Sequence, residues 1–230
     1  MTSLSLIIPA AGSGVRLGTE VPKPFIEIDG KTILQHTIEK FIDIPGLRQV
    51  IVVASAQSVS LVEELISDYA LPDLQFSVVE GGKERQNSIY NALKTVDQKT
   101  DLIAVHDAVR PFVETEQIMG CIEAANETGA AVLGVPVRDT IKKVNKEYFV
   151  ESTPDRSVLW QIQTPQVFKR EILIEAYEKA IKEGFTGTDD SSLVENTGVK
   201  VKVVEGGVNN FKITYPIDLK VTEQIIEDAS

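Results

Sequence analysis

The sequence has one cysteine in 230 residues and no long apolar run. A single cysteine, Cys121, excludes an internal disulfide and any metal site built from a cysteine cluster. Its place in a helix-spaced apolar pattern predicts a small buried side chain rather than a nucleophile. No stretch approaches the roughly 18 apolar residues of a membrane span, and no signal-peptide pattern opens the chain. We therefore expect a cytoplasmic protein with no membrane partner.

Basic residues are also scarce. The chain has 34 acidic against 23 basic residues, a formal net charge of −11, and no basic run. Proteins that bind nucleic acid present a broad basic face, so this balance argues against a nucleic-acid partner. Any anionic ligand has to be met by a few locally placed cations. Each Arg or Lys beside a glycine-rich or strand-end loop is therefore informative.

Short apolar runs alternate with helix-spaced segments along most of the chain. This alternation predicts an α/β fold: a single Rossmann-like domain over residues 1–230, with a mostly parallel sheet flanked by helices. The expected strands are residues 4–8, 49–54, 75–79, 102–105 and 130–136, with late strands at 199–204 and 210–214. The expected helices are an early one opened by a Thr32–Gln35 capping box, then 59–69, 85–96, 115–128 and 170–183, and a last one beginning near Pro216.

The pattern breaks at about residues 138–160, which have no helical period. Two short β-type runs flank Asn145-Lys146-Glu147, which suits a hairpin turn. The segment is too short to form a domain. We call it the arm and expect it to protrude from the sheet as a β-structure that lies on another surface.

Three polar features follow expected strands: the loop Pro9–Gly18, the pair Gly81-Gly82, and His106-Asp107. Ligands of parallel sheets bind beyond the carboxyl ends of the strands, so these features should converge on one site. Glycines let backbone N–H groups approach a ligand closely and form an anion-binding nest. With Arg16 and Lys23 close by in sequence, the first loop is predicted to cradle a triphosphate.

Several familiar sites are excluded by spacing. The dinucleotide fingerprint requires glycine at its sixth position, which is Leu17 here, and Pro22 and Pro24 delay the helix. The Gly-Lys-Ser/Thr ending of a P-loop is absent, and so is the Gly-x-Ser-x-Gly of a serine hydrolase.

The loop Pro9–Gly18, followed by Pro22–Phe25, resembles the nucleotide loop of sugar-nucleotide and polyol-phosphate nucleotidyltransferases. Seven further blocks occur in the order typical of 2-C-methyl-D-erythritol 4-phosphate cytidylyltransferases, within the polyol-phosphate cytidylyltransferase family. They are Gly81–Ser88, His106–Pro111, Pro136–Lys142, Asp155-Arg156, Gln163–Gln166, Thr188–Asp190 and Asn210–Thr214. The resemblance covers the chain from end to end.

The resemblance implies transfer of CMP from CTP to 2-C-methyl-D-erythritol 4-phosphate, with release of pyrophosphate, in the non-mevalonate isoprenoid pathway. Arg16, Lys23 and Lys212 are the implied catalytic residues. The implied nucleotide-binding residues are Ala10, Ala11, Gly12, Gly14, Gly82, Ser88, Asp107 and Ala108. Mg²⁺, or another divalent cation, is the implied cofactor, and Asp107 is its expected carboxylate ligand.

For the polyol phosphate, the resemblance implies Arg110, Thr140, Arg156, Thr164 and Lys212. Thr140 and Arg156 belong to the arm. In this family the arm crosses a two-fold interface, which implies a homodimer in which Arg156 completes the partner's site. An ordinary surface hairpin remains the second interpretation of the arm.

Two different functions are also compatible with the sequence. Ribitol-5-phosphate cytidylyltransferases share the loop and the His-Asp block; Ala10–Gly12, Val137–Lys142 and Asp155–Trp160 favour methylerythritol phosphate instead. A non-catalytic nucleotide-binding regulator would keep the loop without needing Thr140 or Arg156.

Individual residues also have purely structural interpretations. Asp107 is compatible with a turn cap, Ser88 with the start of a helix, and residues 188–190 with a helix cap. Arg85 is compatible with a solvated face or with a contact to the nucleotide. Lys83 and, with less consequence, Val109 and Phe211 depart from the family pattern. Lys83 puts any contact of that side chain with cytosine in doubt.

Overall fold

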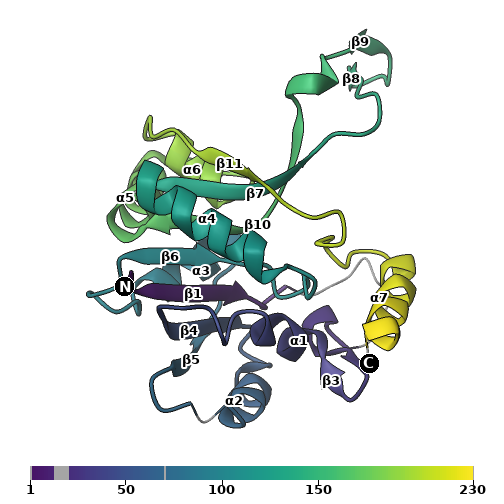
Figure 1. The fold of residues 1–230 in the computed structure, drawn as a ribbon. Coiled ribbons are helices and arrows are strands. Elements are labelled where there is room, and N and C mark those ends of the chain that lie inside the picture. Colours follow the sequence, from purple (N-terminus) through teal and green to yellow (C-terminus); the bar gives the residue numbers. More distant parts are fainter. Residues whose placement is uncertain (1, 13–20, 70, 230) are drawn as a thin grey trace.

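The computed structural model describes residues 2–12, 21–69 and 71–229. In these ranges, seven strands form one sheet in the order β11-β7-β10-β6-β1-β4-β5 (Figure 1). The strands are β1 (Leu4–Pro9), β4 (Leu47–Ala54), β5 (Gln75–Glu80), β6 (Leu102–Val105), β7 (Ala130–Pro136), β10 (Trp160–Lys169) and β11 (Lys202–Glu205). Strand β10 is antiparallel to both of its neighbours, and the remaining pairs are parallel. The predicted mostly parallel α/β sheet is confirmed.

Helices cover both faces of the sheet because its strands are apolar on both sides. Leu4, Leu6 and Ile8 of β1 pack with one group of helices, whereas Ile7 packs with the other. The first group is α1 (Ile33–Glu39), α2 (Val59–Ser67) and α4 (Thr115–Thr128). The second is α3 (Arg85–Leu93), α5 (Arg170–Glu183) and α6 (Asp190–Glu195). Cys121 is buried in the first cluster, as its helical spacing predicts.

Local signals account for the helix ends. Thr32 caps α1, with the Gln35 side chain completing the predicted capping box. Gly129 and Gly184 end α4 and α5 with φ values of 91° and 67°, the left-handed conformation that glycine adopts without strain. None of the helices in the described ranges is long and apolar enough to cross a bilayer.

The C-terminal helix α7 (Pro216–Ala229) lies near a small ribbon of β2 (Glu27–Ile28) and β3 (Lys31–Thr32) and the short 3-10 turn Lys23–Phe25 (Figure 1). A third apolar cluster joins these parts. It contains Ile28, Ile33, Val109 and Ile213, with Leu219 and Ile226 of α7 packed against it. Residues 210–214 are thereby brought to the ends of β1 and β6.

The prediction of a strand at residues 210–214 is wrong. Ile213 makes one backbone bond to Val109 (N···O 3.0 Å), but no ladder forms. Side chains donate hydrogen bonds to the carbonyl groups of this segment instead. Arg110 donates to the Asn210 carbonyl, and the Thr214 hydroxyl donates to the Lys212 carbonyl. The strand before it is also shorter than predicted, since β11 begins at Lys202.

The arm projects away from the body of the sheet (Figure 1). It carries β8 (Lys143–Val144), β9 (Val150–Ser152) and a 3-10 turn at Arg156–Val158. The predicted hairpin is confirmed with shorter strands. At its turn, the Asn145 carboxamide oxygen accepts from the N–H groups of Glu147 and Phe149.

The arm exposes an unusual amount of apolar surface. Tyr148 is 87% exposed and Phe149 is 68% exposed. Val144, Val150, Val158, Trp160 and Ile162 are exposed as well. Exposed apolar side chains gathered on one protrusion are typical of interfaces, and an isolated two-stranded ribbon is marginally stable in water.

Candidate active site

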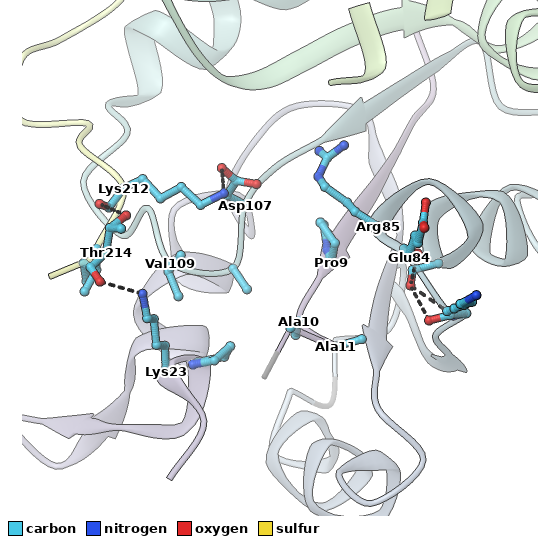
Figure 2. Close-up of a pocket in the computed structure, with 17 residues that line it drawn as sticks. Pro9, Ala10, Ala11, Lys23, Glu84, Arg85, Asp107, Val109, Lys212 and Thr214 are labelled. Carbon is cyan, nitrogen blue, oxygen red and sulfur yellow. Dashed lines mark hydrogen bonds and ion pairs between the residues drawn. The ribbon is translucent and has the colours of Figure 1, made fainter. Parts of the chain in front are cut away.

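Three strand-end loops meet at the carboxyl edge of the sheet, as predicted. A backbone bond fixes the start of each loop to a neighbouring strand: Ala10 N–H donates to Val53 of β4, Gly81 N–H to Ala54 of β4, and His106 N–H to Ile7 of β1. They enclose a cavity of about 640 Å³, within the range of small-molecule sites (Figure 2). Its lining includes four cationic side chains, Lys23, Lys83, Arg85 and Lys212, and two acidic ones, Glu84 and Asp107. The cavity is therefore locally basic in an acidic protein.

Glycine is required in one wall because of close packing. A Cβ on Gly82 would lie 2.5 Å from the Cβ of Asn87, and one on Gly81 would lie 2.8 Å from the Cβ of Ala11. Real Cβ atoms do not approach so closely. The Gly81-Gly82 turn therefore packs directly on the first glycine loop and on the start of α3.

Ser88 stabilises this turn from α3. Its hydroxyl accepts from Gly82 N–H at 3.0 Å and donates to the Glu84 carbonyl at 2.9 Å. Ser88 also lines the cavity. The residue thus shapes a wall that the resemblance assigns to nucleotide binding.

Asp107 lies at the centre of the charged groups (Figure 2). Its Oδ2 is 3.1 Å from Lys212 Nζ and 3.1 Å from Arg110 Nε. Burial raises the pKa of Asp107, but the nearby charges of Lys212, Arg110 and Arg85 outweigh it and hold that pKa well below its ordinary value. The carboxylate stays ionised at neutral pH.

A buried polar network supports Asp107 from behind. The Thr164 hydroxyl accepts from Asp107 N–H at 3.0 Å and lies 3.2 Å from His106 Nδ1. The other ring nitrogen of His106 lies 3.0 Å from the Arg110 carbonyl. Complete burial is the main cause that lowers the pKa of His106 to about 4. The imidazole is therefore neutral at pH 7. It bridges the Thr164 hydroxyl of β10 and the Arg110 carbonyl in the loop after β6.

This depressed pKa predicts a pH-dependent stability. Between pH 6.5 and 4 the unfolded chain protonates His106 and the folded protein does not, so stability falls as the pH drops. The shift corresponds to about 3 kcal/mol of unfolding free energy. Urea denaturation should show a flatter dependence for His106→Gln than for the unmodified protein across this window. Parallel curves for the two proteins would contradict the assignment.

Lys23 and Lys212 come from opposite ends of the chain and meet at one side of the cavity (Figure 2). Lys23 Nζ donates to the Thr214 carbonyl at 2.8 Å. The segment 210–214 is anchored by the buried Asn210, whose side-chain N–H group donates to the Thr164 carbonyl at 2.9 Å. The Lys212 ammonium is thus held by Asp107 and the Lys23 ammonium by the Thr214 carbonyl. Both lysines line the cavity, where they can neutralise an anionic ligand.

The sequence profile of the family described as 2-C-methyl-D-erythritol 4-phosphate cytidylyltransferase matches residues 4–228. The chain belongs to this family. A cytidylyltransferase of that name from Caldanaerobacter subterraneus subsp. tengcongensis is 44% identical over 221 residues, which cover 96% of this chain and 97% of the relative. One from Clostridioides difficile is 44% identical and is covered to 93%, with 96% of this chain aligned.

Solved structures agree. The 4-diphosphocytidyl-2C-methyl-D-erythritol synthase of Anaerococcus prevotii superposes with a TM-score of 0.87 at 31% identity, covering 98% of this chain and 96% of that one. The cytidylyltransferase of Thermus thermophilus superposes with a TM-score of 0.79 at 33% identity, and 98% of each chain is covered. The fold and the nucleotidyltransferase class expected from the resemblance are therefore confirmed.

The structure brings most of the family's implied site residues together. Those that line the cavity are Ala10, Ala11, Gly12, Lys23, Gly82, Ser88, Asp107, Ala108 and Lys212. Arg16 and Gly14 lie outside the described residues. Arg110 and Thr164 do not line the cavity in the part of the chain described; they hold Asp107 instead. Their direct contact with a polyol stays a prediction.

Thr140 and Arg156 belong to the arm, which projects away from the sheet (Figure 1), and neither residue lines the cavity. Both are exposed, and Arg156 donates to the Arg138 carbonyl at 2.8 Å, a contact within the arm. The described part of one chain therefore does not bring them to its own site.

Eight lining residues were not among the site residues implied by the resemblance: Pro9, Pro24, Lys83, Glu84, Arg85, Val109, Ile213 and Thr214. Each lies inside a block that carries the family resemblance, which is the signal that would have found them. For Thr188–Asp190 the cap interpretation is correct for Asp189, whose carboxylate accepts from Ser192 N–H. Asp190 instead pairs with Arg85.

Proposed function

We propose that the protein transfers CMP from CTP to 2-C-methyl-D-erythritol 4-phosphate in the non-mevalonate pathway of isoprenoid biosynthesis. A phosphate oxygen of the polyol attacks the α-phosphorus, the bond to the β-phosphate oxygen breaks, and pyrophosphate leaves. The products are 4-diphosphocytidyl-2-C-methyl-D-erythritol and pyrophosphate. Family membership over residues 4–228 carries this conclusion, and the basic cavity at the sheet edge fits it.

The chemistry suits the residues present. The nucleophile is already an anion, so the reaction needs positioning and charge neutralisation rather than a general base. Lys23 and Arg16, which precedes it in the sequence, are proposed to neutralise charge that builds at the α-phosphate. Backbone N–H groups of Ala11 and Gly12 would hold the remaining phosphates. Lys212 would neutralise the approaching polyol phosphate.

The site also fits a divalent cation. In the described residues no group of three or more metal-ligating side chains occurs, but Mg²⁺ commonly binds through one carboxylate together with substrate phosphates. Both cations that pair with Asp107 contact its Oδ2, so Oδ1 faces a different direction and suits a metal. When bound, Mg²⁺ would offset phosphate charge; Asp107 would hold it, and Lys212 and Arg110 would keep that carboxylate oriented.

We further propose a homodimer formed through the arm. The exposed Tyr148, Phe149 and Val158 supply apolar surface for an interface. Thr140 and Arg156 lie on the same protrusion, outside their own chain's cavity. In a two-fold arrangement each arm would present them to the partner's polyol phosphate.

The test is a substrate matrix. CTP, UTP, ATP and GTP are each combined with 2-C-methyl-D-erythritol 4-phosphate or ribitol 5-phosphate in the presence of Mg²⁺, and pyrophosphate is measured. We expect release only with CTP and the methylerythritol substrate. Turnover restricted to ribitol 5-phosphate would overturn the substrate, and no turnover in any pair would favour a nucleotide-binding regulator.

A further inference from the structure

The fully buried carboxylate of Asp190 is paired with Arg85, whose side chain lines the cavity. Asp190, the first residue of α6, has no exposed side-chain surface, whereas the Arg85 side chain is 35% exposed. Arg85 Nη2 lies 2.7 Å from Asp190 Oδ2. The ion pair therefore joins a side chain of the protein interior to a side chain in the wall of the cavity.

Neighbouring elements fix this carboxylate in place. The Tyr177 hydroxyl of α5 donates to Asp190 Oδ1 at 2.5 Å. The ring of Tyr177 stacks on Tyr90 of α3, with centroids 6.3 Å apart and planes within 6° of parallel. The Gln166 carboxamide of β10 accepts from Ser191 N–H at 2.9 Å, which holds the start of α6. Asp190 is thus positioned by α3, α5 and β10 together.

Stability does not explain such a pair. The desolvation of two charges offsets much of their attraction, and apolar side chains of similar volume often stabilise a protein equally well. A buried carboxylate whose arginine opens into a ligand cavity therefore suggests a demand from the ligand. Arg85 also contributes to lowering the pKa of Asp107, which places its charge within range of the centre of the site.

The position of Arg85 indicates which ligand it meets. Figure 2 shows its side chain on the opposite side of the cavity from Lys23 and Thr214. It extends from the same segment as Gly82 and Ser88, the wall assigned to the nucleotide. A guanidinium has five N–H donors in a planar fork, and the bond to Asp190 uses Nη2, so the fork can bind an anion while the pair persists.

We propose that Arg85 binds phosphate oxygens of CTP, and that Asp190 and Tyr177 are positioning residues that hold its guanidinium toward the cavity. This inference rests on the proposed function. It adds a third cation to the nucleotide side of the site, and it gives the Thr188–Asp190 block a function beyond capping α6.

The test measures CTP binding by titration calorimetry with Mg²⁺ and without polyol phosphate, together with the melting temperature of each variant. Arg85→Gln should weaken CTP binding by about 10- to 100-fold, the loss typical of a charge-assisted contact. Arg85→Lys keeps the charge without the fork and should lose about tenfold. Tyr177→Phe should weaken binding by a few-fold. The KM for the polyol phosphate should change less than twofold in all three.

A double variant separates binding from folding. Arg85→Gln alone leaves Asp190 without its cation and should lower the melting temperature. Arg85→Gln with Asp190→Asn removes that charge, so the melting temperature should recover while CTP affinity does not. Leu173→Ala, a buried apolar change in the same helix as Tyr177, should lower the melting temperature without changing CTP affinity.

Unchanged CTP affinity in Arg85→Gln, or affinity that recovers with the melting temperature in the double variant, would overturn the inference. So would a loss seen mainly in the KM of the polyol phosphate. These outcomes leave the proposed function intact if the unmodified protein turns over. If the unmodified protein binds CTP but releases no pyrophosphate, the proposed function is wrong, but CTP binding by the variants still tests the inference about Arg85. If the unmodified protein binds no CTP, both the proposed function and the inference are overturned.

Discussion

Lys23→Ala is expected to lower kcat by about 10²- to 10³-fold, the loss typical when one preorganised charge donor is removed from a transition state. Lys23 is buried at the cavity wall, and its ammonium is fixed by the Thr214 carbonyl at 2.8 Å. Negative charge increases around the α-phosphate as the two phosphates approach. The lysine is therefore expected to affect kcat more strongly than the KM for CTP.

Steady-state pyrophosphate release with saturating methylerythritol phosphate measures this effect. Lys31→Ala is a suitable control, because Lys31 belongs to the adjacent strand β3 and forms an exposed ion pair with Glu39. Such a pair contributes little to stability, so the control should retain full activity. Lys23→Arg should retain part of it. A loss in Lys23→Ala confined to KM would show that the lysine binds the nucleotide without favouring the transition state.

The second large expected effect is a recovery of activity when two inactive variants form a mixed dimer. Lys23→Ala and Arg156→Ala subunits should each be nearly inactive as homodimers, yet their heterodimers should regain one intact site of two. In the proposed dimer, that site takes Lys23 from one subunit and Arg156 from the arm of the other. With random pairing about half of the dimers are mixed, so activity should return to about a quarter of the unmodified level in the mixture and to about half in the isolated heterodimer.

Co-expression of the two variants with different affinity tags, followed by sequential purification, isolates the heterodimer for assay. The matched control combines Lys23→Ala with Asp107→Ala, because both residues line the cavity of the same chain. Each heterodimer site then lacks one residue, and no recovery is expected. Heterodimers of the first kind that are no more active than their parents would contradict action of the arm on the partner's site.

Most of the fold was predictable because its signals are local. Helices α4 and α5 begin and end where the apolar period, the terminal glycines and the strand-type runs indicate. The alternation of apolar and polar residues over 210–214 predicts a strand, and that prediction is wrong. Such alternation produces a strand only when the backbone of the segment pairs with another strand. Here the Arg110 side chain donates to the Asn210 carbonyl, and the buried Asn210 side chain anchors the segment to the Thr164 carbonyl. No local pattern reveals these contacts.

The active site likewise has features that follow from the sequence and features that depend on the tertiary structure. The sequence by itself determined the glycine-rich loops, their positions after strands and the chemistry of the family blocks, because close backbone approach and phosphate charge restrict which residues are possible. Only the tertiary structure decided which charges meet. Lys23 and Thr214 are 191 residues apart in the chain, and Arg85 and Asp190 are 105 apart. Contacts across such separations depend on how the sheet orders its strands, so the pairing of cations with Asp107 and Asp190 emerges only when the chain is folded.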